Sequence, residues 1–245
     1  MKSKLLNSIL LLTAVTAVLV SCKKEVKEIT DRQYSFDNNA LVQVYMGTVS
    51  ATRNYVLVDN VPVTGAALAL GGIFPSTGHA ASLAAGSRTL TIKDTLATST
   101  QAPYTLTSTF AGKKYYTLFM YDTITSPKCL LVENDYQLMF EETAKLRFAN
   151  LIFSKTVIPA VDIFSKRQNA NLFSNVPIAK VTDFVQVNTG ISDTLIVRQT
   201  GTSTQLAVLN SLVLQRQHFY TVVFRGSYGA TSGTNARTLS SFTNY

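Results

Sequence analysis

Side chains that could act as nucleophiles or metal ligands are few in this sequence and lie far apart. The chain has two cysteines, Cys22 and Cys129, and two histidines, His79 and His218. Neither histidine has another histidine, a cysteine or a carboxylate beside it at the spacing of a metal site. Only Lys128 stands near Cys129 to lower the pKa of its thiol. We therefore expect a loop position for His79, a strand-start position for His218, an unreactive, partly buried Cys129, and neither metal nor cofactor.

The carboxylates do not form a recognisable acid–base pair. Glu141 and Glu142 are adjacent, and consecutive side chains of an extended strand point to opposite sides. Asp162 and Asp183 fall at expected strand edges or turns, where a carboxylate commonly accepts hydrogen bonds from backbone amides. Motifs of nucleophilic serines, phosphate loops and dinucleotide sites are absent. The sequence therefore gives no catalytic residue.

Cys22 is the cysteine with a clear chemistry. Lys2 and Lys4 precede an apolar run over 5–20, which ends in Leu19-Val20-Ser21-Cys22. A basic start, a short apolar stretch and small residues before the cut are typical of a signal peptide. A cysteine directly after Ser21 is the residue to which bacterial lipoproteins attach diacylglycerol through a thioether. We expect a lipoprotein signal peptide over 1–21 and lipidation of Cys22. The alternative, an uncleaved anchor, is disfavoured because a spanning helix needs about 20 apolar residues.

A charged tether and a folded body follow the signal peptide. The segment 23–39 holds four basic and four acidic residues with little apolar periodicity, so we interpret residues 22–39 as a flexible lipidated tether. The whole chain is 46% hydrophobic and 15% charged, which suits a globular body with its own core. The expected location is the bacterial outer membrane, with the protein held by its lipid and facing either the periplasm or the cell surface.

The body is an internal repeat. The segment 110–120 matches the segment 214–224 at an offset of 104 residues, and the same offset places Val42-Gln43-Val44 on Leu146-Arg147-Phe148. One offset that holds over so much of the chain indicates a duplicated domain. We predict domain 1 over 40–135, a connector over 136–143 and domain 2 over 144–245. The middle of the connector is apolar, which would suit packing between the domains.

Each copy has the pattern of an all-β fold. Short, alternating, β-branched segments are separated by Gly, Asn, Asp, Ser and Pro, at a spacing typical of antiparallel sandwiches. Leu90 and Ile92, for example, alternate with Thr89 and Thr91. We predict two tandem immunoglobulin-like antiparallel β-sandwich domains. Candidate strands of the first copy lie near 41–47, 54–60, 66–70, 79–84, 88–94, 104–110, 114–122 and 128–133.

Four segments of the second copy resemble a known family. They are Ala144–Leu151, Pro159–Phe164, Val181–Gly190 and Phe219–Phe224. Together they are similar to an uncharacterised β-sandwich family, a domain of unknown function that is often duplicated in lipoproteins of the Bacteroidota cell envelope. The likeness is weaker over 40–135. It implies a fold and a compartment, and no activity.

Charge is distributed unevenly between the copies. Residues 40–135 hold six basic and five acidic side chains, whereas 144–245 hold ten and three. The excess could favour an anionic surface such as lipopolysaccharide or an acidic glycan, or it could be a solvated set of outward positions that keeps the domain soluble. Nucleic acid is a poor candidate for a partner, because export removes the protein from the cytoplasm and the sequence has no aromatic–basic stacking motif. The basic set includes Lys145, Lys155, Lys166, Arg167, Lys180, Arg198, Arg216, Arg225 and Arg237.

The sequence pattern assigns most aromatic residues to the core. The most apolar strand of the first copy holds Tyr115, Tyr116 and Phe119, and that of the second copy holds Phe219, Tyr220 and Phe224. Tyr228, in the polar loop over 226–235, is better placed for contact, because loops at one end of a sandwich often bind ligands. We therefore take Tyr228, Arg225 and Arg237 as candidate ligand-binding residues.

These patterns favour a non-catalytic, lipid-anchored envelope protein that presents a binding or adhesion surface for a glycan, matrix or protein ligand. The alternative is a structural accessory subunit that docks on another envelope protein through the connector or an exposed strand edge. A hydrolase is third, because no motif supports it.

Overall fold

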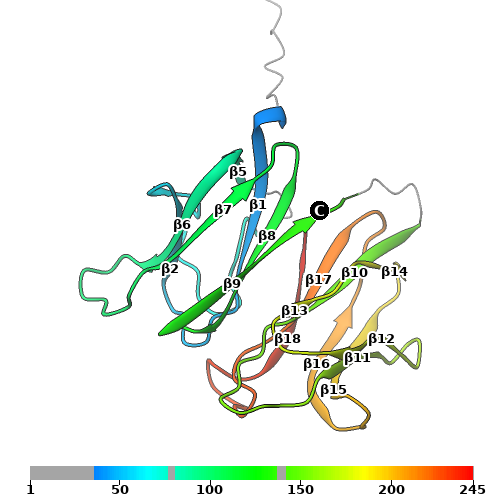
Figure 1. Cartoon of the computed structure of the whole chain (residues 1–245). Coiled ribbons are helices and arrows are strands. Elements are labelled where there is room, and N and C mark those ends of the chain that lie inside the picture. The colour runs from blue at the N-terminus through cyan, green and yellow to red at the C-terminus, as the bar shows by residue number, and fades with distance from the viewer. Residues whose placement is uncertain (1–35, 77–80, 137–141, 245) are drawn as a thin grey trace, which may run out of the picture. The chain divides into compact units, whose positions relative to one another are not determined.

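The structure, a computed structural model, describes residues 36–76, 81–136 and 142–244. Phe36–Tyr245 belong to one compact unit, which begins with the short 3-10 helix η1 (Phe36–Asn38) and is otherwise built of strands (Figure 1). The predicted signal peptide, most of the tether, His79 and the middle of the connector lie outside the described residues. Within the described part of the chain, no helix has the length and apolarity needed to cross a membrane.

Among the described residues, nine strands form the first sandwich. Its inner sheet has the order β4-β1-β8-β9, with β5 also paired to β1, and its outer sheet has the order β3-β2-β6-β7. The bounds are β1 Asn39–Met46, β2 Asn54–Val58, β3 Val61–Pro62, β4 Ile73–Phe74, β5 Ala81–Ala84, β6 Gly86–Asp94, β7 Tyr104–Phe110, β8 Tyr115–Thr123 and β9 Ser126–Asn134.

Nine further strands form the second sandwich in the same arrangement. Its inner sheet has the order β13-β10-β17-β18, with β14 also paired to β10, and its outer sheet has the order β12-β11-β15-β16. The bounds are β10 Thr143–Asn150, β11 Val161–Ser165, β12 Ala170–Val176, β13 Lys180–Val181, β14 Val185–Asn188, β15 Asp193–Gln199, β16 Gln205–Leu212, β17 Phe219–Arg225 and β18 Thr238–Thr243.

The pairing register of the strands is repeated in the two sandwiches. Leu41 pairs with Tyr115 between β1 and β8, and Lys145 pairs with Phe219 between β10 and β17, so both pairs are related by the offset of 104. The predicted tandem sandwich fold is confirmed. One feature differs from the expectation of wholly antiparallel sheets, because β1–β8 and β10–β17 are parallel. The predicted strand over 66–70 is wrong: this segment contributes only a bridge between Asn54 and Leu68.

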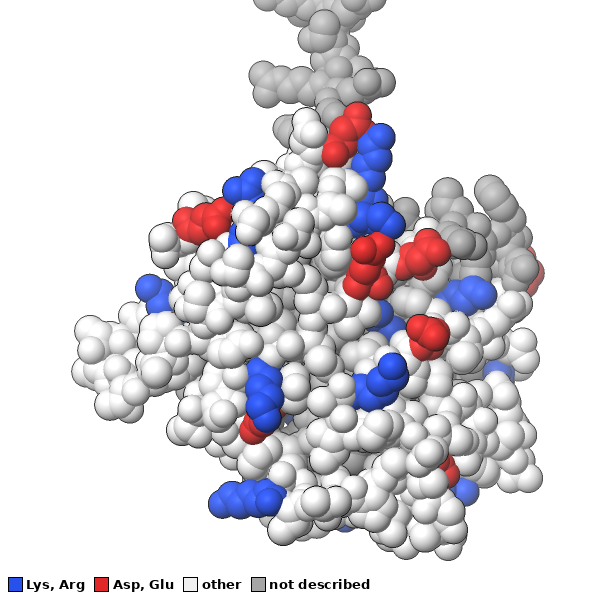
Figure 2. Space-filling model, in the orientation of Figure 1, with Lys and Arg blue, Asp and Glu red and all other residues white. Residues whose placement is uncertain are grey.

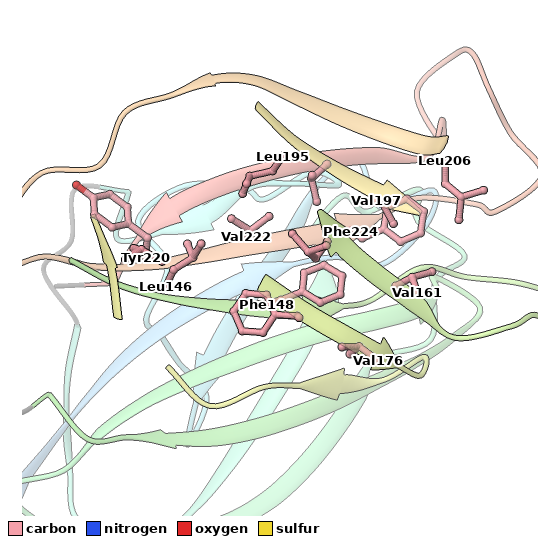
Figure 3. Packing of buried hydrophobic residues seen from close by; sticks show 14 of the residues in the cluster. Leu146, Phe148, Val161, Val176, Leu195, Val197, Leu206, Tyr220, Val222 and Phe224 are labelled. Atoms are coloured by element: carbon pink, nitrogen blue, oxygen red, sulfur yellow. The ribbon is translucent and has the colours of Figure 1, made fainter. Parts of the chain in front are cut away.

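Alternation directs one face of each strand into a sandwich core. The core of the second sandwich gathers apolar residues from both of its sheets, among them Leu146, Phe148, Val161, Val197 and Phe224 (Figure 3). The first sandwich has an equivalent core around β1, β2, β6 and β8. These cores hold the two sheets of each sandwich together by burial of apolar area.

A tyrosine fixes the same turn in each sandwich. The hydroxyl of Tyr116 accepts a hydrogen bond from the backbone N–H of Ala111, and the hydroxyl of Tyr220 accepts one from the N–H of Gln215, both at 3.1 Å. Each tyrosine hydroxyl thus bonds the backbone five residues earlier in the chain, as in the tyrosine corner of immunoglobulin-like sandwiches.

The two inner sheets pack against each other, and we call this contact the junction. A third apolar cluster lies there, built from Tyr45 and Phe119 of the first sandwich and Ala149, Leu151 and Val223 of the second. The tyrosine hydroxyl also lies 3.3 Å from the Ser240 hydroxyl across the junction. Strands β1, β8, β10 and β17 are therefore buried on both faces, which explains why β8 and β17 are so apolar.

A buried polar network lies within the junction. Arg147 is 2% exposed, and its guanidinium donates to Thr221 Oγ1 at 2.8 Å, Asn134 Oδ1 at 2.7 Å and Thr117 Oγ1 at 3.1 Å. Its cationic carbon lies 4.6 Å from the ring centre of Phe184. Burial lowers the pKa of Arg147 to about 10. Because three acceptors and a ring face the guanidinium, the buried group is solvated by the protein.

The network has a two-fold character. Arg147 reaches Asn134 of the first sandwich, while Gln43, 104 residues before it, accepts a hydrogen bond from Asn244 of the second. Asn134 stands opposite Tyr115 at the start of β8, and Asn244 donates its backbone N–H to the carbonyl of Phe219 at the start of β17. Equivalent positions thus contact each other in both directions, as in an isologous dimer interface.

Candidate functional site

One end of the two sandwiches collects the segments in which they differ most. This loop end comprises 47–53, 63–72, 95–103 and 124–125 of the first sandwich and 151–160, 177–179, 200–204 and 226–237 of the second. Gly47 approaches the side chain of Leu151 there, and Asn235 bonds Ser50 through both its amide nitrogen and its amide oxygen. The loops of the two sandwiches are therefore neighbours at this end.

Two loops of the second sandwich are longer than their counterparts. The segment 226–237 has twelve residues where 124–125 has two, and 151–160 has ten where 47–53 has seven. Backbone hydrogen bonds tie them together: the N–H of Phe153 donates to Gly226 O and the N–H of Tyr228 donates to Phe153 O, both at 2.8 Å. These two loops form one preorganised surface.

Two of the predicted ligand-binding residues meet on this surface. The cationic carbon of Arg237 lies 5.7 Å from the ring centre of Tyr228, and one of its terminal nitrogens donates to the backbone carbonyl of Tyr228 at 3.0 Å. The tyrosine ring packs on the core of the second sandwich, which fixes the orientation of both side chains.

The third predicted residue is separated from them. Arg225 follows Val223 on the side of β17 that faces the junction, and its guanidinium lies against Gly71 of the first sandwich. Burial raises the pKa of the nearby Tyr45 hydroxyl, and the charge of Arg225 acts in the opposite direction. Arg225 therefore contacts the other sandwich, while its role in ligand binding stays a prediction.

A second stacked arginine lies on the outer sheet. The cationic carbon of Arg198 is 3.5 Å from the ring centre of Phe164. Asp162 stands opposite Arg198 in the register of β11 and β15, but its carboxylate accepts hydrogen bonds from Asn171, Asn175 and Thr200. The expected capping role of Asp162 is thus seen directly, and Arg198 pairs with a ring instead of a carboxylate.

Ion pairing differs between the sandwiches. Four basic residues of the first sandwich lie within 4.0 Å of one of its carboxylates: Arg53 with Asp94, Arg88 with Asp59, Lys114 with Glu133 and Lys128 with Asp122. In the second sandwich, Arg216 has such a contact, with Glu142. No ion pair is found for the other nine basic side chains of β10–β18 and their loops within the described chain: Lys145, Arg147, Lys155, Lys166, Arg167, Lys180, Arg198, Arg225 and Arg237.

The surface reflects this difference. On the face shown in Figure 2, most of the acidic groups lie toward the end that carries η1, and fewer lie in the lower part, where basic groups are also present. Lys155 and Lys180 are exposed, and both lie at the loop end of the second sandwich. Lys155 and Lys180 therefore place positive charge at the loop end of the second sandwich, and neither has an ion pair within the described part of the chain.

Other candidate groups are occupied or inert. A surface hollow of about 340 Å³ opens beside β3 and β5, but its arginine, Arg88, already donates to Asp59 and to the carbonyls of Ala84 and Ala85. Burial raises the pKa of Cys129 to about 12, in agreement with the expected unreactive thiol. Within the described residues, His, Cys, Asp and Glu form no group that could hold a metal ion.

Sequence reasoning missed Phe164, Phe153 and the distinct position of Arg225. An aromatic and an arginine on neighbouring strands give a signal only when the register of β11 and β15 is known. The alternation of β17 did contain a signal for Arg225, since the residue shares a face with Thr221 and Val223, which are buried in the junction.

The chain was compared with solved structures, with curated proteins and with models of protein families. The chain is similar to a solved structure described as alpha-glucan recognition by family 41 carbohydrate-binding modules from streptococcal virulence factors, with 7% identity, a TM-score of 0.25, and coverage of 82% of this chain and 96% of that one. A second solved structure, of alpha-glucan binding by a streptococcal virulence factor, has 8% identity, a TM-score of 0.21, and coverage of 76% and 92%. No curated protein matches the sequence. Residues 40–158, which contain the first sandwich and β10, match the model of a domain of unknown function, DUF4397. This match supports the resemblance to a family of uncharacterised domains.

Proposed function

We propose that the protein is a non-catalytic lipoprotein of the bacterial cell envelope, anchored through Cys22, which presents the loop end of its second sandwich as a binding surface. The observation that carries the proposal is the contrast in ion pairing. Exposed basic side chains without a carboxylate partner, such as Lys155 and Lys180, are free to pair with a ligand. Most basic side chains of the first sandwich already have partners inside the protein.

The loops of this end support the same function. The loops 151–160 and 226–237 are longer than their counterparts in the first sandwich, and backbone hydrogen bonds hold Phe153 and Tyr228 in place. A binding surface that is ordered before the ligand arrives loses less conformational entropy on binding. Rigid sandwiches with variable loops commonly place their binding residues in this way.

The anchor is tested by following the lipid. We expect the mature chain to incorporate labelled fatty acid and to partition into detergent, and we expect Cys22→Ala to abolish both. Recovery of a native chain that starts at Met1, with a free thiol at position 22, would contradict the anchor. Protease treatment of intact cells then separates exposure at the cell surface from a periplasmic position.

The binding surface is tested by capture. The detergent-solubilised full chain is immobilised and exposed to a panel of neutral glycans, acidic glycans and matrix proteins. We expect retention of at least one panel member and its loss in Tyr228→Ala, with thermal unfolding of the variant measured as the control for folding. Retention that Tyr228→Ala leaves unchanged would remove Tyr228 from the surface.

The accessory alternative is favoured by one observation. Strand β16 is an edge of the outer sheet, paired only with β15 in the sheet order, and its Val208 is 41% exposed. An exposed edge offers backbone N–H and C=O groups to a strand of another protein. Stoichiometric recovery of one envelope protein from solubilised membranes, with no retention of any panel member, would favour this alternative.

A further inference from the structure

We propose that the ligand of this surface is an acidic polysaccharide, bound along a row formed by Arg198, Gln205 and Arg237. The inference rests on the proposed function and names its ligand class. It follows from how the two arginines are held, from where they lie, and from what surrounds them.

Each arginine lies over an aromatic ring. Arg198 stacks on Phe164 at 3.5 Å, and Arg237 lies 5.7 Å from the ring centre of Tyr228. The Nε atoms of both arginines are buried and have no hydrogen-bond partner. The terminal nitrogens of a guanidinium can donate charge-assisted hydrogen bonds to a carboxylate or sulfate. In Arg237 one of them already donates to the carbonyl of Tyr228, which leaves the other for a ligand.

The two arginines belong to neighbouring elements at one rim. Arg198 pairs with Gln205 between β15 and β16. Strand β16 adjoins β18 at the side where the two sheets meet, and β18 begins directly after Arg237. Arg198, Gln205 and Arg237 therefore follow one another around the rim of the loop end. Positive charges that are separated by a neutral amide fit a chain with spaced anionic groups better than a single small anion.

The surroundings of the row are rich in hydroxyl groups. The adjoining loop 200–204 is Thr-Gly-Thr-Ser-Thr, and residues 231–234 of the second loop are Thr-Ser-Gly-Thr. Nearly all of these residues are exposed. Hydroxyl groups both donate and accept hydrogen bonds, so they suit the hydroxyls of a sugar chain between its acidic groups.

A membrane surface fits this rim less well. At the loop end of the second sandwich, Val157 is the one strongly exposed large apolar side chain among the described residues. Binding at a lipid interface increases with the apolar area that is buried in it, and one valine supplies little. The inner sheets, which carry the larger apolar faces, are already covered at the junction.

The experiment uses the full lipidated chain in detergent micelles and a matched pair of probes, dextran sulfate and neutral dextran, with polygalacturonate as a carboxylate probe. We expect binding to dextran sulfate and polygalacturonate, none to dextran, and weakening by sodium chloride, because exposed charges are screened within about 10 Å at 0.1 M salt. Arg198→Gln and Arg237→Gln should each weaken binding about tenfold, as loss of a charge-assisted hydrogen bond does.

Arg53→Gln is the control. Arg53 also lies over an aromatic ring, 5.8 Å from the centre of Tyr55, and also has a buried Nε that makes no hydrogen bond. It differs in lying 3.8 Å from Asp94 and in belonging to the first sandwich. The same loss of charge at this position should leave polysaccharide binding unchanged.

The outcomes separate this inference from the proposed function. Retention of neutral glycans or matrix proteins with no preference for dextran sulfate would overturn the acidic ligand and leave the binding function standing. Binding of phosphatidylglycerol vesicles without binding of either acidic polysaccharide would also overturn it. Equal loss in Arg53→Gln would show a general charge effect and overturn the row. No retention of any probe or panel member would remove the proposed function as well.

Discussion

The two sandwiches share a strand order and a register, yet they treat charge and loops in opposite ways. The first sandwich pairs most of its basic side chains with its own carboxylates and joins β8 to β9 by two residues. The second leaves most of its basic side chains without carboxylates and joins β17 to β18 by twelve. Core packing and register are under the same physical constraints in both copies, whereas loops and surface charges are free to diverge and so to acquire function.

The largest expected effect tests whether the two sandwiches have equivalent core positions, and it concerns Cys129. It pairs with Met120 in the first sandwich, as Leu239 pairs with Phe224 in the second, so the thiol occupies a core position. Burial raises its pKa from 9.0 to about 12. At pH 8 the thiolate fraction should therefore be about a thousandfold smaller than for an exposed thiol.

Iodoacetamide labelling, followed by mass analysis of the Cys129 peptide, checks this expectation. Labelling should be very slow in the native chain and fast in guanidinium chloride, which removes the burial. Rapid labelling of the native chain at pH 8 would contradict the core position.

The next effect concerns the junction that joins the two copies. Arg147→Ala removes three buried hydrogen bonds, to Thr117, Asn134 and Thr221, and leaves the amide oxygen of Asn134 without its arginine donor. We expect the free energy of unfolding to fall by about 3 kcal/mol, measured by urea denaturation. Arg216→Ala, which removes an exposed ion pair, is the matched control and should have little effect. A similar loss in both variants would mean that the buried network does not stabilise the junction.

A smaller effect compares equivalent residues directly. Tyr116→Phe and Tyr220→Phe each delete the acceptor of one backbone N–H, at Ala111 and Gln215 respectively. Each should lower the free energy of unfolding by about 1 kcal/mol, and the two losses should be similar because the geometry is repeated. Thermal unfolding of the pair measures this, and a loss confined to one variant would break the equivalence of the two turns.

Repetition made much of the fold predictable from the sequence. A single offset identified the duplicated copies, and the alternation of Leu90 and Ile92 with Thr89 and Thr91 identified the faces of β6. The short strands β3 and β4 were not predictable, because two-residue strands have no periodicity. The segment 66–70 misled for the opposite reason, since its alternating apolar residues form a loop that packs Leu68 into the core.

The junction was harder to predict because alternation distinguishes two faces without saying what covers the second. Arg147 alternates with Leu146 and Phe148 as a solvent-facing residue would, yet it is buried. The available signal was the apolar character of both faces of β8 and β17, which is typical of strands covered on two sides. The candidate site was half predicted: Tyr228 and Arg237 meet, while the stacking of Arg198 on Phe164 depends on a pairing of distant strands.

The two-fold contact at the junction has a consequence for assembly. Separate polypeptides with such matching faces would associate only above a threshold concentration, whereas covalent linkage supplies each face with its mate at a high effective concentration. The two sandwiches therefore stay in contact even when the protein is present at few copies per cell. The two halves of the contact can also differ in sequence, as Gln43 and Arg147 do at equivalent positions.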